Sequence, residues 1–239
     1  MVTTSPLSAA GGVENVARNI IKQLRIRGID AFGVHAYERY SNPVKSVLGF
    51  RGIPRIVDEH KPDIVHTHDN AGYWIAKSGR DFVHTSHGTW INYFDSMPST
   101  ARDRIVKRPV ISMEKKIVNE AAKNTAVSFF VRASVRKQYK IHKAIEVVHN
   151  GVDTGKFFPA DRKGEPAALW VGTNPVLKGL DLAISAARLA KIKLVVAGVD
   201  GKSDKDVRFL GKVKPENMPA IYRSADLLVF PSLYESYPI

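Results

Sequence analysis

The sequence predicts an α/β protein with two parallel-sheet domains. Apolar, strand-forming runs alternate with segments whose apolar residues recur at helical spacing. This alternation is typical of parallel sheets with helices on both faces. The turn signal Asn150-Gly151 and the segment 157–164 that follows it divide the chain. We therefore expect a first domain over residues 1–158 and a second over residues 159–239.

In the first domain, small-residue and turn signals set the expected boundaries. A loop over residues 8–12 precedes a helix over 13–24, and Gly28 is placed to end that helix. Pro62 stops a short helix over 53–60. The remaining elements of this domain are expected as helices over 102–123 and 131–139 and as strands over 2–4, 31–36, 63–68, 82–85, 125–128 and 145–148.

The second domain is expected to begin with a strand over 168–171. A helix over 180–190 follows, and further strands are expected over 194–197, 207–210 and 227–230. The first turn places Lys178-Gly179 just ahead of the helix, and Glu235 follows the last strand. Ligands bind at the carboxyl edge of such sheets, so these residues are candidates for a binding site.

Composition excludes several classes of protein. Hydrophobic residues make up 44% and charged residues 25%, which is ordinary for a globular protein. The chain has no cysteine, which excludes disulfides and thiolate metal sites. No apolar run approaches the ~20 residues needed to span a bilayer, and residues 1–6 lack the features of a signal peptide. From the sequence we expect a cytoplasmic protein.

The net charge of +13 is concentrated in one segment. Residues 102–143 hold twelve Lys or Arg residues against three acidic ones, a balance of +9. Such a patch attracts anionic lipid headgroups, nucleic acid or an anionic acceptor. A solvated face of a basic protein explains the same charges equally well.

Three groups of residues suggest chemistry, although each has an ordinary structural explanation. Gly11 and Gly12 open a helix and leave N–H groups free for an anion, but glycine before a helix is also a common turn. The pattern is not G-x-G-x-x-G, so it does not imply a dinucleotide. Lys178-Gly179 at a helix entry suits a pyrophosphate, and Glu235 could accept hydrogen bonds from sugar hydroxyls.

Four histidines raise the question of a metal site: His66, His68, His84 and His87. Zinc needs three or four converging ligands, and the sequence gives no such set, so we expect no metal. His66 and His68 should share one face of a strand. His87 differs because it follows the end of a strand, where a polar side chain can reach a ligand.

The ordered motifs resemble one enzyme family over essentially the whole chain. They read GGVE, DIVHTH, HTSHG, VVHNGVDTGKFFP, LWVGTNPVLKG, VRFLG and YRSADLLVFPSLYESYP. This set resembles the retaining glycosyltransferases of family 4, which have the GT-B fold of two Rossmann-like domains. The resemblance implies a nucleoside-diphosphate sugar donor held by the second domain, an acceptor held mostly by the first, and no metal or other cofactor.

The resemblance also implies residue roles. Gly11 and Gly12 would approach the donor phosphates or the acceptor, and His87 would contact the transferred sugar. Lys178, beside Gly179, would bind the diphosphate. Glu235 would hold the sugar hydroxyls as the first Glu of an E-x7-E motif.

The chain departs from the family pattern in three places, one of which is a first strand that looks clipped at its start. Gly172 in the donor turn is followed by Thr173, where the family usually has Arg, so one phosphate cation is missing. The chain ends at Ile239, before a second Glu of E-x7-E. We therefore expect an inactive fragment with an incomplete second domain and an uncovered edge strand that favours self-association.

The function expected from the sequence is transfer of a hexosyl unit, with retention of configuration, to a sugar or lipid-linked acceptor. We expect residues 102–143 to bind an anionic membrane surface and not nucleic acid. The protein would then be peripheral on the membrane. A GT-B nucleotide-sugar epimerase and a non-catalytic basic binding module remain alternatives.

Overall fold

The structure, a computed structural model, describes residues 1–3, 7, 11–35, 50–97, 100–159 and 165–238, without the side chains of Arg102 and Arg104. The chain forms two compact units, Met1–Gly151 with Ser236–Ile239, and Val152–Glu235. The sequence placed the division after residue 158. The expected loop residues 8–10, the strand ends at residues 4 and 36, and linker residues 160–164 lie outside the described residues.

The first unit contains a parallel sheet in the order β2-β1-β3-β4-β5-β6. Its strands are β1 (Val2–Thr3), β2 (Val34–His35), β3 (His66–His68), β4 (Val83–Ser86), β5 (Lys123–Ala126) and β6 (Ile145–Val147). The chain passes from β1 to β2 on one side and then to β3 on the other side of β1. The crevice at such a reversal, beyond the carboxyl ends of the strands, is where ligands bind in doubly wound sheets.

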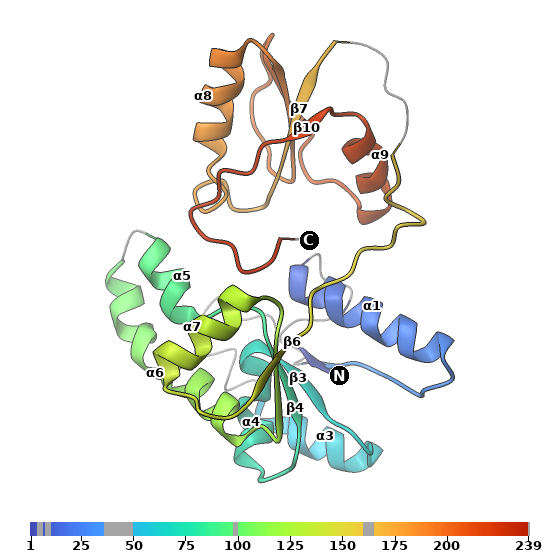
Figure 1. The fold of residues 1–239 in the computed structure, drawn as a ribbon, viewed down its shortest axis with the longest axis vertical. Helices are drawn as coiled ribbons and strands as arrows, with labels where there is room; N and C mark the ends of the chain where they lie inside the picture. The colour runs from blue at the N-terminus through green and yellow to red at the C-terminus, as the bar shows by residue number, and fades with distance from the viewer. Residues whose placement is uncertain (4–6, 8–10, 36–49, 98–99, 160–164, 239) are drawn as a thin grey trace. The chain divides into compact units, whose positions relative to one another are not determined.

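Helices cover both faces of this sheet. Figure 1 shows α1 on one side of the sheet and α5, α6 and α7 on the other. α3 lies on the same face as α4 and α6, because residues of all three helices share one buried cluster. The helical segments are α1 (Gly12–Ile26), η1 (Phe50–Gly52), α3 (Ile53–His60), η2 (Asp69–Gly72), α4 (Tyr73–Lys77), α5 (Trp90–Ser96), α6 (Ala101–Glu120) and α7 (Phe129–Tyr139).

The packing of the first unit follows from its apolar pattern. Val65 and Phe82, which immediately precede β3 and β4, lie in one buried cluster with Ile75 of α4 and Ile117 of α6. Burial of each such side chain contributes about 1.5–3 kcal/mol. The N-cap of α6 is Thr100, and its side chain and that of Asp103 form a reciprocal capping box. This cap satisfies N–H groups at the start of the 20-residue helix.

The second unit contains a smaller parallel sheet in the order β10-β7-β8-β9. Its elements are β7 (Ala167–Val171), α8 (Leu180–Ala190), β8 (Lys193–Ala197), β9 (Val207–Phe209), η3 (Pro215–Asn217), α9 (Met218–Arg223) and β10 (Leu227–Leu228). Trp170, Leu194 and Val196 of the strands pack with Ala183 of α8 in its core. The sheet reverses between β7 and β10, so the carboxyl ends of these two strands flank its ligand-binding crevice.

These two parallel sheets confirm the predicted fold class. Several strands begin later or end earlier than predicted: β2 begins at Val34, β3 begins at His66, and β10 ends at Leu228. The short helices α4, α5 and α9, of five to seven residues, were not predicted because one or two turns leave no readable apolar period. Among the described residues, no helix combines the length and apolar character needed to cross a membrane.

Candidate functional site

In the second unit, the two residues predicted for donor binding come together. The Lys178 Nζ contacts the Glu235 Oε1 as an ion pair, and both side chains are about three-quarters buried. Lys178 follows β7, and Glu235 follows β10. The topology therefore places a cation and a carboxylate at the carboxyl edge, on either side of the reversal of the sheet.

A network of hydrogen bonds fixes the turn that carries Lys178. The Lys178 N–H donates to the Asn174 carbonyl at 3.0 Å, and the Leu177 N–H donates to the Asn174 side-chain oxygen at 3.0 Å. The buried Trp170 indole N–H donates to the Lys178 carbonyl at 2.9 Å. The Lys178 Nζ also lies 5.2 Å from the centre of the Phe230 ring. The ammonium group is therefore held by its own turn and by the segment after β10.

Gly179 connects this turn to α8 and must be glycine. Its φ of 62° is left-handed, and a Cβ would overlap the backbone carbonyl of Pro231. Gly179 is the N-cap of α8, so the Lys178 ammonium lies at the positive end of that helix. A Cβ at Gly172 would come within 3.0 Å of the Lys178 Cγ, and Thr173 is exposed.

In the first unit, Gly11 and Gly12 differ in their surroundings. Gly11 is the N-cap of α1, and a Cβ there would overlap the side chain of Glu14. Gly12 is exposed and has open space beside it. Glu14, in the first turn of α1, is buried. A side chain at Gly11 would therefore displace the Glu14 carboxylate, which already lies at this helix end, whereas Gly12 has room for one.

His87 lies at the carboxyl end of β4 and contacts two residues that follow or end β3. Its Nε2 is 2.9 Å from the Nδ1 of His68, and its backbone N–H donates to the Asp69 Oδ1 at 3.3 Å. The His66 ring stacks on the His68 ring at 4.5 Å. His66 and His68 therefore share a face, as predicted. His84 points elsewhere and bonds through Nδ1 to the Thr67 hydroxyl at 3.0 Å.

Burial keeps three of these histidines neutral. It lowers the pKa of His66 to about 4, helped by repulsion from the Met1 amine and from the protonated form of His87, and it lowers the pKa of His84 to about 3. Burial also lowers the pKa of His68 well below its usual value. Burial raises the pKa of Asp69, an effect that attraction to the protonated form of His87 and the hydrogen bond from the His87 backbone N–H partly offset. Among the described residues, no group of three or more His, Asp or Glu side chains is arranged to hold a metal ion.

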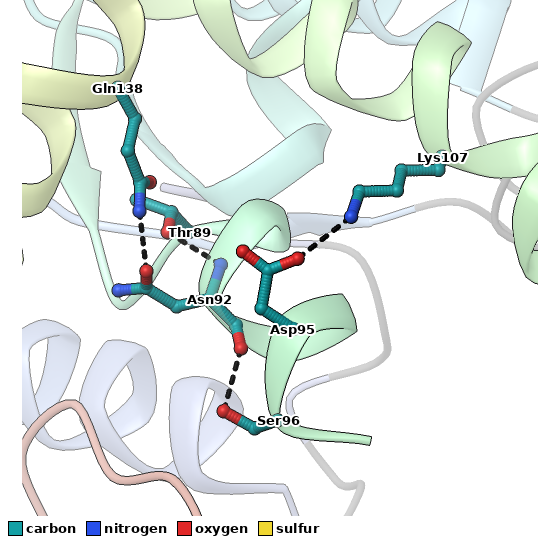
Figure 2. A network of polar contacts seen from close by, with 6 residues as sticks. All are labelled: Thr89, Asn92, Asp95, Ser96, Lys107 and Gln138. Carbon is teal, nitrogen blue, oxygen red and sulfur yellow. Dashed lines mark hydrogen bonds and ion pairs between the residues drawn. The ribbon is translucent and has the colours of Figure 1, made fainter. Parts of the chain in front are cut away.

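The segment after His87 is held by a polar network (Figure 2). The Thr89 hydroxyl accepts the Asn92 N–H at 3.2 Å and so caps α5. The Asn92 side-chain oxygen accepts from the Gln138 amide of α7, and the Ser96 hydroxyl donates to the Asn92 carbonyl at 2.8 Å. Asp95 pairs with Lys107 of α6 at 2.8 Å. Contacts to α6 and α7 therefore fix the helix that follows His87.

Reasoning from the sequence missed two buried groups near these residues. Glu14, the last residue of the GGVE motif, is buried beside Gly11, and no role was predicted for it. Glu114 of α6 is also buried and accepts the Trp90 backbone N–H at 3.0 Å and the Tyr139 hydroxyl. The sequence carried no signal for Glu114, since a lone Glu in a basic segment resembles a surface charge.

Comparison with known proteins connects both units to glycosyl transfer. The model of Glycosyltransferase Family 4 matches residues 10–156, and that of Glycosyl transferases group 1 matches residues 165–239. A D-inositol 3-phosphate glycosyltransferase of Mycobacterium leprae is 28% identical over 89% of this chain and 58% of its own length. One from Mycobacterium sp. (strain KMS) is 27% identical over 98% of this chain and 61% of its own length.

The chain thus spans about three-fifths of the length of these relatives. Among solved structures, the sucrose-phosphate synthase of Thermosynechococcus elongatus matches all of the chain and 77% of its own length. Its TM-score is 0.81 at 16% sequence identity. This likeness confirms the GT-B fold, and because the first family model covers more than half of the sequence, the chain belongs to glycosyltransferase family 4.

Proposed function

We propose that the chain takes part in transfer of a hexosyl unit from a nucleoside-diphosphate sugar to an acceptor, with retention of configuration. The observation that carries the proposal is the pairing of Lys178 with Glu235 at the reversal of the second sheet. A cation and a carboxylate side by side match the two ends of the donor, an anionic diphosphate and a hydroxyl-rich sugar. Family membership supports the same reaction class.

The donor diphosphate would take the place of Glu235 as the partner of Lys178. The ammonium and the positive N-terminal end of α8 would stabilise the negative charge that grows on the diphosphate as its bond to the sugar breaks. Glu235, released from Lys178, would accept hydrogen bonds from the sugar hydroxyls. Gly172 and Thr173 border the same turn, and the hydroxyl of Thr173 would contact a phosphate oxygen where the family usually has Arg.

The first unit would contribute His87 to the transferred sugar and the Gly11-Gly12 end of α1 to the donor phosphates or the acceptor. The proposal includes no metal and no covalent enzyme intermediate. The leaving-group charge is assigned to Lys178 and to the N-terminus of α8. A chelator should then leave transfer unchanged, and a loss of rate that added metal restores would contradict this part.

The acceptor is proposed from the relatives, whose names specify D-inositol 3-phosphate. A lipid-linked acceptor would instead require contact with a membrane. The support for that contact is the +9 balance of residues 102–143, in which Lys115 on α6 and Arg136 and Lys137 on α7 are exposed. Flotation with anionic and neutral vesicles tests it: we expect capture by anionic vesicles only, lost at high salt. Equal behaviour with both kinds of vesicle would leave these charges as a solvated face.

The proposed reaction is tested by single-turnover assays with the chain in excess over UDP-, GDP- or ADP-hexose. An excess of protein lets one slow turnover be detected without repeated catalytic cycles. We expect slow formation of a glycoside of D-inositol 3-phosphate whose anomeric configuration equals that of the donor. Inversion would contradict retention. Conversion of the donor sugar to its epimer without acceptor would identify an epimerase instead.

A further inference from the structure

The contact between His68 and His87 determines which nitrogen of His87 carries its proton. The two rings meet through the Nδ1 of His68 and the Nε2 of His87 at 2.9 Å. Burial keeps His68 neutral, so it has one N–H and one bare nitrogen. A hydrogen bond between the two nitrogens needs one proton in the contact. Either His68 donates to His87, or His87 donates to His68.

The surroundings of His68 decide between these arrangements. His68 is fully buried, and its Nε2 has no hydrogen-bond partner among the described residues. If His87 donated, the proton of His68 would have to lie on this Nε2, as a buried N–H with nothing to accept it. Such orphaned N–H donors are rare in folded proteins. If His68 donates through Nδ1, its only N–H is paired and Nε2 is left as a bare nitrogen.

We propose that His68 is a positioning residue for His87, and that its Nδ1–H donates to the Nε2 of His87. This bond fixes His87 as the tautomer that carries its proton on Nδ1. The Nδ1 of His87 makes no hydrogen bond to a described residue, and the ring is only half-buried, so this N–H is available to a ligand. The bond between the His87 backbone and Asp69 holds the position of the residue, while His68 sets the direction of its donor.

The consequence for recognition rests on the proposed function. A hexosyl donor offers oxygen atoms that can accept from an N–H. His87 would therefore bind it through its Nδ1–H as a neutral ring, without a second proton. Without the bond from His68, the ring could also present a bare nitrogen or turn away from the ligand. His68 thereby favours binding of a ligand oxygen to the Nδ1–H of His87 without itself touching the ligand.

The comparison with His84 separates this role from ordinary packing. His84 lies in the neighbouring strand, is 1% exposed, and also bonds through Nδ1, but to Thr67. It has no hydrogen bond to His87. If His68 served only to pack the core, replacing His68 or His84 should change the His87 ring to the same extent. If His68 positions His87, only replacement of His68 should change which nitrogen of His87 carries the proton.

The tautomer is measured by long-range ¹H–¹⁵N NMR of the ¹⁵N-histidine-labelled chain, with peaks assigned by single substitutions. We expect the Nδ1 of His87 to have the shift of a protonated nitrogen and its Nε2 that of a bare nitrogen. The opposite pattern in the unsubstituted chain overturns the proposal directly. This measurement needs no activity and no variant of His68 that folds.

Variants then test the cause. His68→Leu should redistribute the His87 proton between its two nitrogens, while His68→Asn, whose amide N–H can replace Nδ1–H, should keep the original pattern. His84→Leu is the matched control and should leave His87 unchanged. An unchanged His87 pattern in a folded His68→Leu chain would overturn the proposal. In single-turnover assays, His68→Leu should slow transfer by roughly 10²-fold and His68→Asn much less. If the NMR spectra show the expected His87 tautomers but neither the unsubstituted chain nor any variant transfers sugar, the proposed function is contradicted and the role of His68 is not.

Discussion

Glu114 should make the stability of the first unit depend strongly on pH. Its side chain is buried on α6, accepts the Trp90 backbone N–H at 3.0 Å, and accepts the Tyr139 hydroxyl. Burial raises its pKa from 4.5 to about 8, although the two hydrogen bonds act in the opposite direction. The nearby charge of Asp69 raises the pKa further.

The direction of the effect follows from proton uptake. Between pH 4.5 and about 8, the carboxyl group is protonated in the folded chain and ionised in the unfolded chain. The folded state then binds more protons, so raising the pH destabilises it. The stability that the protonated Glu114 contributes is complete below pH 4.5 and is lost as the pH rises through about 8. Each pH unit inside this window costs about 1.4 kcal/mol, so roughly 3 kcal/mol is lost between pH 5 and 7.

The test substitution is Glu114→Gln, which keeps the accepting oxygen but cannot titrate. Urea unfolding at several pH values from 5 to 8 gives the free energy of unfolding of each protein. We expect the variant to gain stability relative to the unsubstituted chain as pH rises, by about 3 kcal/mol from pH 5 to 7. Contributions from His66 and His84 cancel in this difference.

Glu120→Gln provides the matched control, because Glu120 ends the same helix but is exposed and pairs with Lys116 at 3.3 Å. Its removal should change stability by less than about 1 kcal/mol and with little dependence on pH. Parallel pH profiles for Glu114→Gln and the unsubstituted chain would refute the reasoning, because they would mean that Glu114 is ionised in the folded state.

Two further predictions concern the second unit. Gly179→Ala should lower the free energy of unfolding by at least about 1–2 kcal/mol, because Gly179 has a left-handed φ and lies against the Pro231 carbonyl. Gly12→Ala is the control and should leave stability nearly unchanged, because Gly12 has open space beside it. Equal melting temperatures for the two variants would contradict this prediction. The edge strand β10 exposes 44% of Leu227 and 47% of Leu228 and should promote self-association. Leu228→Lys should shift sedimentation toward the monomer, and concentration-independent sedimentation of the unsubstituted chain would argue against the edge-strand mechanism.

The sequence predicted the elements with a strong local signal and missed contacts that depend on register. The helix α3 was predicted to the residue because apolar spacing and Pro62 define both of its ends. Lys178 and Glu235 were each predicted at the carboxyl edge of the sheet. Their contact could not be predicted, because the two residues are 57 positions apart in the chain and meet only when β10 pairs with β7.

The histidine contacts illustrate the same limit. The pattern DIVHTH predicts that His66 and His68 share a face, since side chains alternate along a strand. The contact from His68 to His87 depends on how β3 and β4 align, with His68 opposite Thr85. Local sequence does not specify this register. Burial of Glu114 likewise depends on α5 and α7 packing beside α6, and α5 was too short to predict.

The central claim, that Lys178 and the start of α8 form a diphosphate site, is tested most directly by calorimetry. Binding of UDP, GDP and ADP is compared with binding of uridine, guanosine and adenosine for the unsubstituted chain and for Lys178→Ala. The control is Lys193→Ala, which removes the same charge at the opposite edge of the sheet, where Lys193 pairs with Glu165 at 2.5 Å. We expect Lys178→Ala to weaken binding of the preferred diphosphate by about 1.5–3 kcal/mol, with little change for its nucleoside and no effect from Lys193→Ala. Equal losses for diphosphate and nucleoside, or equal losses in the two variants, would contradict the claim.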